Sequence, residues 1–379
     1  MGYLFWFSLA VLAYHLVGYG LLLNFLNLFS KSHKGETHFE DYPTITVLCP
    51  AFNEEKVIEA KISSFLQLNY PADKIKMIVI SDDSTDGTNE IVNKFSGDNN
   101  IELVVQKPRR GKQSGHNLVE PDINTDYVLS TDANSIFAPD SVKKMVRRMQ
   151  SEPDIALVSG ELKLIKKNGT DSGEGLYWKY ESWLKSLESK FYSIIGANGS
   201  IYLIKREYFQ QINPASVDDF ERTLQVIRSG EKAKYEPEAV VYEAVTEKPS
   251  EEISRKIRMI TQQWFCLERN LFLLNLFANF KVFFLFISHK LIRWMLPLFS
   301  TLILISALFQ VHIAFYRFCL VIQVMVYLIA VIELVLEKKG SSIKIFKLPA
   351  YFAAMNYSAF LAFIKYLKRE QFSTWKVER

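Results

Sequence analysis

The chain has 379 residues, of which 49% are hydrophobic and 14% are aromatic, enough for one sizeable core and further structure beside it. The net charge of +4 is too small to indicate a class of partner by itself. The three cysteines, Cys49, Cys266 and Cys319, are scattered and have no metal-type spacing. They exclude a disulfide framework and are typical of a reducing compartment.

The first apolar stretch runs from about Tyr3 to Phe29 and contains no Lys, Arg, Asp or Glu. It is long enough to cross a bilayer with a hydrocarbon thickness of roughly 30 Å. It lacks the basic start, the shorter apolar core and the small-residue cleavage site of a signal peptide. We therefore expect a transmembrane anchor over residues 1–30.

Three further apolar stretches lie in the carboxyl third, from about Leu291 to Phe309, from Ile313 to Leu336 and from Leu348 to Ile364. We expect a transmembrane bundle over residues 291–366. The last stretch either crosses the bilayer or forms an interfacial or re-entrant helix. We expect the interfacial or re-entrant helix, because crossing would place the basic tail, residues 367–379, outside.

The segment that precedes this bundle, residues 269–290, is aromatic and apolar between Leu271 and Phe286. It is interrupted by Asn275, Asn279 and Lys281. This pattern is typical of an interfacial helix, which we expect here.

Basic residues mark the cytoplasmic ends of the predicted spans. They follow the first span, open the second and follow the third: Lys31, Lys34, Lys290, Arg293, Lys338, Lys339, Lys344 and Lys347. We therefore expect a multi-pass protein of the plasma (inner) membrane, with residues 40–268 as a cytoplasmic domain.

Short apolar strands alternate with helical patterns in that domain. The predicted strands are Thr44 to Cys49, Lys76 to Ile80, Ile101 to Val105 and Tyr127 to Leu129. Helical patterns follow the first strand through about Leu68 and the second from about Asn89. The alternation predicts an α/β fold with a doubly wound, mostly parallel sheet.

Polar side chains follow the strand that begins at Tyr127. Asp132 and Asn134 stand two residues apart, just where ligands collect in an open α/β sheet. Oxygen-bearing side chains suit Mg²⁺ or Mn²⁺, whose coordination is commonly completed by substrate phosphates. The pattern indicates a metal-diphosphate site, or alternatively a turn whose side chains bond their own backbone.

An acidic loop and a basic loop are expected at the same edge of the sheet. The acidic loop from Asp82 is not an EF-hand, because its twelfth position is Asn93 rather than Glu. Asp86 or Thr88 caps the next helix, which leaves Asp82 free for a ligand. The basic loop, Arg109-Arg110-Gly111-Lys112, is not a Walker A loop; it is either merely solvated or grips a diphosphate.

These motifs, taken together, resemble family 2 inverting glycosyltransferases of the GT-A fold. More narrowly they resemble membrane-integrated polysaccharide synthases, such as cellulose, hyaluronan and poly-N-acetylglucosamine synthases. The matching runs, in the order that the family keeps, are Pro50 to Glu54, Ser81-Asp82 with Ser84 to Thr88, Gly111-Lys112 with Asn117, Thr131 to Asn134, Gly196 to Tyr202 and Val217-Asp218-Asp219.

The resemblance implies a role for each matching residue. Ala51, Asn53, Glu54 and Asp82 would hold the base and ribose of a nucleotide-sugar. Asp132 and Asn134 would carry Mg²⁺ or Mn²⁺ on the diphosphate, and Lys112 would neutralise further phosphate charge. Asp219 matches the general base that takes the proton from the attacking hydroxyl. The alternative for Asp218 and Asp219 is that they only favour a helix amino terminus.

The chain departs from the family pattern at two positions. An acid usually stands where this chain has Asn134, which weakens or changes the metal preference. The Gln-x-x-Arg-Trp motif of processive synthases aligns with Arg255 to Met259, in which only Arg258 is kept. Trp264 would substitute for the missing aromatic beside the acceptor, or is an interfacial Trp on an amphipathic helix. The tail from Phe372 to Lys376 resembles a gating segment or is plainly solvated.

The resemblance implies a membrane-bound hexosyltransferase. It would move a sugar from a nucleotide-sugar, expected to be UDP-linked, to a saccharide or lipid-linked acceptor in cell-surface polysaccharide synthesis. The expected partners are donor, acceptor and lipid bilayer, without nucleic acid; an oligomer or a secretion partner is left open. The alternative is a non-catalytic nucleotide-sugar-binding subunit of a synthase or secretion complex.

Overall fold

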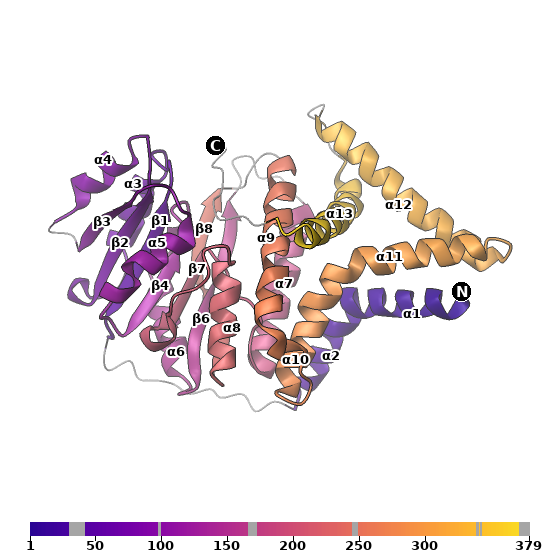
Figure 1. Ribbon diagram of the computed structural model, residues 1–379, viewed down its shortest axis with the longest axis horizontal. Helices are drawn as coiled ribbons and strands as arrows, with labels where there is room; N and C mark the ends of the chain where they lie inside the picture. Colours follow the sequence, from indigo (N-terminus) through magenta and orange to yellow (C-terminus); the bar gives the residue numbers. More distant parts are fainter. Residues whose placement is uncertain are drawn as a thin grey trace.

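The computed structural model describes residues 1–29, 42–97, 100–165, 173–244, 249–338, 341 and 343–370. Figure 1 shows a sheet covered by helices on one side of the molecule and a group of long helices on the other. Helices α7 (Gly173–Phe191) and α9 (Pro249–Arg269) lie between the two parts. The predicted tail segment from Phe372 to Lys376 lies outside the described residues.

Among the described residues, eight strands form one sheet in the order β3-β2-β1-β4-β7-β6-β8-β5. They are β1 (Ile45–Ala51), β2 (Ile75–Asp82), β3 (Ile101–Gln106), β4 (Tyr127–Thr131), β5 (Ile136–Phe137), β6 (Ile155–Ile165), β7 (Ile201–Lys205) and β8 (Lys232–Ala244). Strands β3, β2, β1 and β4 pair in parallel, as the sequence predicts. Their carboxyl ends therefore meet at one edge, where the polar loops gather.

The other half of the sheet is mixed. Strand β7 runs antiparallel to both β4 and β6, β6 runs parallel to β8, and β5 runs antiparallel to β8. This half was not predicted strand by strand, because its strands do not alternate regularly with helical patterns. The α/β fold class is confirmed, with a more mixed sheet than expected.

Helices cover both faces of the sheet, and the alternation of side chains along β1 shows why. Ile45, Val47 and Cys49 pack on one face with side chains of α3 (Ile58–Leu66), α4 (Thr88–Phe95) and α6 (Ser141–Gln150). Leu48 points to the opposite face, towards the segment after α5 (Lys112–Val119) and towards α8 (Asp218–Arg228). Such a strand, buried on both faces, is typical of a doubly wound sheet.

Helix α5 packs closely on β2. A Cβ atom added to Gly115 would lie 2.8 Å from Cγ2 of Ile80, so only glycine allows this approach. The packing holds the amino-terminal end of α5, with Lys112, at the edge where the parallel strands end.

Three helical runs in the described part of the chain are long and apolar enough to cross a membrane: Gly2–Leu26, Phe280–Phe309 and Ala314–Leu336. They comprise α1 (Gly2–Ala13) with α2 (Tyr19–Leu26), α10 (Phe280–Phe286) with α11 (Ile292–Phe309), and α12 (Ala314–Lys338). A π-helical turn, Tyr14–Gly18, joins α1 to α2, and another, Ile287–Leu291, joins α10 to α11. The predicted anchor and two of the predicted carboxyl-terminal spans thus correspond to candidate membrane helices.

The segment predicted as one interfacial helix is divided. Leu271–Leu274 forms a short 3₁₀ turn, and a new helix begins at Phe280. Asn279 caps this helix, because its side chain accepts a hydrogen bond from the backbone N–H of Val282 at 3.2 Å. The prediction of a single interfacial helix from Leu271 to Phe286 is therefore wrong: the asparagine starts a longer apolar helix.

The last helix, α13 (Lys347–Leu367), is not one of the three candidate spans. It packs along α9 and also contacts α11 and α12 (Figure 1). Whether α13 lies at the membrane surface stays a prediction. The remaining short 3₁₀ turns in the described residues are Ala72–Lys74, Glu120–Asp122, Arg206–Tyr208 and Lys344–Phe346.

The sheet part and the long helices share a hydrophobic core. Tyr19 of α2, Leu184 of α7, Phe220 of α8 and Phe286 of α10 belong to one buried cluster. The two π-helical turns also touch, because the Tyr14 hydroxyl lies 2.7 Å from Oγ of Ser288. These contacts fix the candidate membrane helices against the domain that carries the polar loops.

Candidate active site

The loop after β1 is held in a fixed shape. Asn53 has a left-handed backbone (φ 53°), and its side-chain oxygen accepts a hydrogen bond from the N–H of Thr85 at 2.8 Å. The N–H of Glu54 donates to the Thr88 hydroxyl at 2.9 Å. These contacts join the loop to the one after β2. Glu54 lines the large cavity described below, whereas Ala51 and Asn53 lie outside its lining.

Asp82 ends β2, and only 2% of its surface is exposed. Its carboxylate accepts hydrogen bonds from the backbone N–H groups of Arg110 (2.8 Å) and Gly111 (2.9 Å) and from Nε2 of Gln106 (2.5 Å). Both oxygens of Asp82 therefore already accept hydrogen bonds, because the basic loop folds back onto them. Direct contact of Asp82 with a nucleotide stays a prediction.

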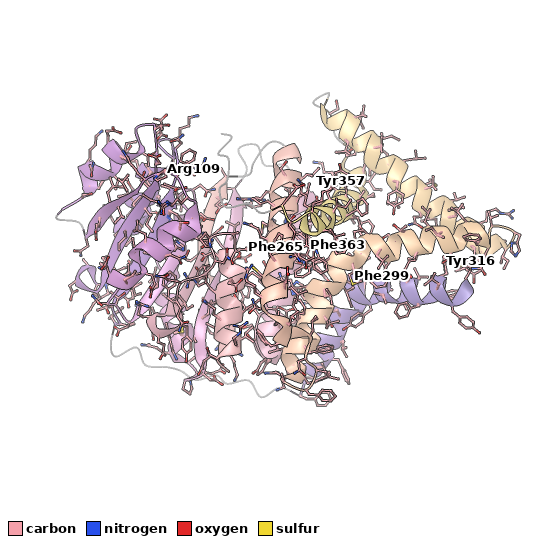
Figure 2. The ribbon with its side chains drawn as sticks, in the orientation of Figure 1. Arg109, Phe265, Phe299, Tyr316, Tyr357 and Phe363 are labelled. Atoms are coloured by element: carbon pink, nitrogen blue, oxygen red, sulfur yellow. The ribbon has the colours of Figure 1, made fainter. Side chains whose placement is uncertain are left out.

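The basic loop is fixed by a second contact. The guanidinium of Arg109, labelled in Figure 2, lies 3.5 Å from the centroid of the Phe52 ring. Its Nε is 3.5 Å from Oδ2 of Asp82. Gly111, with φ of 92°, then turns the chain into α5 in a conformation that favours glycine. As a result, Lys112 begins the helix at the edge of the sheet.

Lys112 and Asp132 meet at this edge. Nζ of Lys112 lies 2.9 Å from Oδ1 of Asp132 and 3.7 Å from Oδ2 of Asp218. Burial alone lowers the pKa of Lys112, but the two carboxylates outweigh burial and raise this pKa above its ordinary value. The ammonium group is therefore charged at neutral pH and lies between two acids.

Two buried charges support the turn that carries Asp132 and Asn134. Lys61 of α3 donates to the Thr131 hydroxyl at 2.7 Å and to the Ser135 carbonyl at 2.5 Å. Burial lowers the pKa of Lys61 to about 7. On the other side, the Glu243 carboxylate accepts hydrogen bonds from the hydroxyls of Ser135 and Ser200.

Asp218 begins α8 as a buried carboxylate. Oδ2 accepts a hydrogen bond from the Tyr202 hydroxyl at 2.6 Å, and Oδ1 lies 3.6 Å from Nε of Arg222 and 3.5 Å from Nδ1 of His116. Burial raises the pKa of Asp218, but His116, Lys112 and Arg222 outweigh it and hold this pKa well below its usual range. Asp218 is thus an ionised structural anion.

The pKa of the neighbouring residue, Asp219, is shifted in the opposite direction. Its Oδ1 accepts a hydrogen bond from the backbone N–H of Phe220 at 2.7 Å. Burial, followed by the negative charge of Asp218, raises the pKa of Asp219 above its ordinary value. A Cβ atom added to Gly199 would lie 3.2 Å from Oδ2, so the loop before β7 closely borders this carboxylate.

A cavity of about 700 Å³ lies at this edge of the sheet. Glu54, Lys112, Asp132, Asn134 and Asp219 all line it. Its walls extend from the ends of β1 and β4 across α7, α9 and α13 to the π-helical turns at Tyr14–Gly18 and Ile287–Leu291. The edge of the sheet and the candidate membrane helices therefore share one continuous space.

Residues 46–212 match the sequence model of glycosyl transferase family 2. This region contains β1 to β7, with the loops that carry Asp82, Lys112 and Asp132. The chain contains a family 2 glycosyltransferase domain.

The chain is also similar to two curated proteins. It is 26% identical over 276 residues to the probable glycosyltransferase YdaM of Bacillus subtilis (strain 168), a match that covers 67% of this chain and 65% of YdaM. It is 29% identical over 140 residues to the poly-beta-1,6-N-acetyl-D-glucosamine synthase of Staphylococcus aureus (strain COL), covering 37% of this chain and 34% of that protein. Each match spans less than two thirds of the relative.

The fold of the chain is also similar to that of the mannosyltransferase PcManGT from Pyrobaculum calidifontis, solved in complex with GDP-Man and Mn²⁺. The TM-score is 0.72 at 21% identity, and the match covers 97% of this chain and 99% of that one. The likeness therefore extends over the domain and the long helices together. It establishes the GT-A-like architecture.

One of the two predicted acceptor-side residues lines the cavity. Arg258 of α9 lines it, and its charge interacts with that of Asp132. Trp264 lies outside the lining, with its ring 5.0 Å from that of Trp294 and 5.3 Å from that of Phe363. Figure 2 labels Phe363 at this contact between α9 and α13. The structure thus places Trp264 in the packing between helices, whereas the sequence predicted either a place beside the acceptor or an interfacial Trp.

Some residues of the candidate site were not predicted from the sequence to belong to it. Lys61, Glu243 and Lys290 are far apart in the sequence and match no motif, and Lys290 was interpreted only as a basic flank of a span. Asp218 was visible in the sequence as the neighbour of Asp219. Only its partners in the fold distinguish the ionised structural acid from the acid with a raised pKa.

Proposed function

We propose that the protein is a membrane-bound inverting glycosyltransferase. It transfers a hexose from a UDP-linked donor to a polysaccharide or lipid-linked acceptor in cell-surface polysaccharide synthesis. The observation that carries this proposal is the shared cavity, which brings Asp132 and Asp219 together although they are far apart in the sequence. The kinship to glycosyltransferases, including a polysaccharide synthase, supports it.

The donor diphosphate is proposed to lie between Asp132, Lys112 and Arg258. Lys112 and Arg258 both line the cavity and supply positive charge next to Asp132. Charge-assisted hydrogen bonds from such groups are strong with phosphate oxygens. The structurally similar mannosyltransferase holds a nucleoside diphosphate sugar, GDP-Man, which supports a donor of this class.

Asp132 and Asn134 fit a divalent cation. The Asp132 side chain is 38% exposed, and both residues line the cavity with oxygen donors suited to Mg²⁺ or Mn²⁺. Within the described residues, no three His, Cys, Asp or Glu side chains form a metal cage. Phosphate oxygens and water would therefore complete the coordination. A bound cation supplies charge stabilisation for the departing diphosphate.

Asp219 is proposed to be the general base. Its raised pKa makes it a stronger proton acceptor than an ordinary carboxylate. As the acceptor hydroxyl attacks the anomeric carbon, a new carbon–oxygen bond forms and the bond to the diphosphate breaks on the opposite face. The hydroxyl proton passes to Asp219. Asp218 stays ionised and fixes the start of α8, so that Asp219 faces the cavity.

The proposed topology follows from the candidate spans and the basic flanks. The three apolar helices cross the plasma (inner) membrane, and the glycosyltransferase domain lies on the cytoplasmic side. The bilayer is then adjacent to the wall of the cavity, because that wall includes Leu16 and Leu296 of two candidate spans.

The Asp219→Asn variant tests this function in purified membranes. Release of UDP from UDP-sugars with Mg²⁺ or Mn²⁺ is expected to fall by about 10²–10⁴-fold, the usual contribution of a positioned base. Asp73→Asn, at an exposed acid far from the cavity, is the control and should be unaffected. Retained turnover in Asp219→Asn would remove the base assignment. Donor binding by wild-type protein without turnover would instead favour the non-catalytic subunit.

A further inference from the structure

The cavity contains a lysine, Lys290, for which the described residues provide no ion pair. Lys290 lies in the π-helical turn Ile287–Leu291 and lines the cavity beside the loop before β7. A Cβ atom added to Gly196 would lie 3.4 Å from Nζ of Lys290, and the Phe220 ring is 6.0 Å from it. Within the described residues, Lys290 makes no hydrogen bond or ion pair.

The polar neighbours of Lys290 in the helix, His289 and Arg293, have acidic partners. Arg293 pairs with Oε1 of Glu181 at 2.6 Å, and His289 lies 2.6 Å from Oε1 of Glu188 and 3.3 Å from Oε2 of Glu181. Glu181 and Glu188 are therefore already paired with other groups, although their charges and that of Asp219 still act on Lys290 at longer range. An anion bound directly to Lys290 would stabilise its ammonium group further.

A second lysine lines the same cavity as Lys290. Lys185 of α7 lines the cavity, and its charge interacts with that of Lys290. In the described part of the chain it forms no ion pair, and its Nζ lies 6.0 Å from the centroid of the Tyr235 ring. Two like charges that face one cavity repel each other, so an anion between them would relieve that repulsion. The Lys185–Lys290 pair is thus an anion-binding feature.

The surroundings of the pair are apolar on the membrane side. Leu16, Leu296, Leu348, Phe352 and Met355 line the cavity there. Leu16 is 40% and Leu348 is 58% exposed on the surface of the molecule. The cavity wall is therefore continuous with apolar surface on the candidate membrane helices. A ligand of matching chemistry has an anionic group and an apolar chain.

We propose that the acceptor is a lipid-linked sugar phosphate whose phosphate binds between Lys290 and Lys185. Its apolar chain lies along Leu16 and Leu348, and a sugar hydroxyl faces Asp219. This inference rests on the proposed transfer reaction and specifies its acceptor. The donor diphosphate is proposed to bind other residues of the cavity, Lys112 and Asp132.

Binding can be measured without turnover. Purified full-length protein in detergent is titrated with farnesyl phosphate, followed by the fluorescence of the cavity tryptophans Trp178 and Trp294. Farnesol is the control that has the apolar chain without the phosphate. Inorganic phosphate is the control that has the phosphate without the apolar chain. Saturable binding of farnesyl phosphate, without comparable binding of the other two, is expected. Equal binding of farnesol overturns the phosphate site, and equal binding of inorganic phosphate overturns the lipid assignment.

Variants then locate the phosphate. Lys290→Gln should weaken farnesyl phosphate binding by roughly tenfold or more, as expected for the loss of one charged hydrogen bond. Lys290→Arg should retain most of the affinity, and Lys94→Gln, at an exposed lysine on α4, should retain all of it. Unchanged binding in Lys290→Gln overturns the proposal, and a thermal unfolding scan confirms that the variant is folded.

The two proposals fail in different ways. If wild-type protein releases no UDP from any UDP-sugar, the transfer function fails, even if farnesyl phosphate binds. If UDP is released but Lys290→Gln has the same KM for a lipid-linked sugar phosphate, only the acceptor assignment fails. A raised KM for that acceptor, with the KM for the donor unchanged, supports the assignment.

Discussion

Nζ of Lys112 lies 2.9 Å from Oδ1 of Asp132, so a cation of the chain already contacts the acid expected to carry a metal ion. The contact joins the start of α5 to the end of β4. It shows that one lysine can both neutralise Asp132 and remain within reach of phosphate oxygens in the cavity. The positive charge for a diphosphate is thus partly built into the fold.

Lys112→Gln should weaken binding of UDP with Mn²⁺ by roughly tenfold or more, because one charge-assisted hydrogen bond to phosphate is lost. Isothermal titration calorimetry on purified protein measures this change. Lys94→Gln removes an exposed lysine of the same charge and should leave the affinity unchanged. Equal affinities in the two variants would show that Lys112 does not contact the donor.

Asn134→Asp should lower the Mn²⁺ concentration needed for half-maximal UDP release. The added carboxylate gives a hard cation a second anionic ligand next to Asp132. Titration of Mn²⁺ at fixed UDP-sugar concentration measures the shift, and Asn124→Asp, at an exposed amide elsewhere, is the control. An unchanged metal dependence would mean that residue 134 does not hold the ion.

The sequence was sufficient to predict those parts of the fold and of the site that are determined by local residue patterns. The apolar runs from Thr44 and Lys76, each followed by a polar turn, predicted parallel strands, and their order placed Asp132 at the ligand edge. Family motifs then indicated Asp219. These features depend on side chains that are close in the sequence, or on a strand arrangement for which the rules of chain connection leave few alternatives.

The sequence was insufficient where distant segments fold onto one another. The engagement of Asp82 depends on a loop 28 residues later, whose N–H of Arg110 reaches its carboxylate. Trp264 was predicted to lie beside the acceptor or to be an interfacial Trp, and only the fold shows that it packs against Phe363 of α13. Lys290 resembles an ordinary basic flank of a span until the π-helical turn is seen to place it in the cavity.

The rate of transfer should depend on pH through Asp219. The ionised form is the base, so activity is lost as the pH falls through its pKa, which burial and Asp218 raise above the ordinary value of about 3.9. The positive charges of Lys112 and Lys290 act in the opposite direction but do not cancel this shift. A profile of kcat/KM against pH should show its acidic limb above the usual range of an aspartate. A limb at or below that value would contradict the assignment.

Asp218→Asn should destabilise the fold rather than remove a proton acceptor. The variant leaves the buried guanidinium of Arg222 without its anion, which costs about 3–5 kcal/mol for a broken buried pair, whereas Lys112 keeps Asp132. Because the folded pKa of Asp218 is lowered, its stabilisation is present above the unfolded pKa and is lost as the pH falls through the folded one. Thermal unfolding in detergent from neutral to acidic pH should therefore show a lower midpoint for Asp218→Asn near neutrality and convergence with wild type in acid. Asp73→Asn should follow the wild-type curve throughout, and the same behaviour in Asp218→Asn would show that the carboxylate is not an ionised anchor of α8.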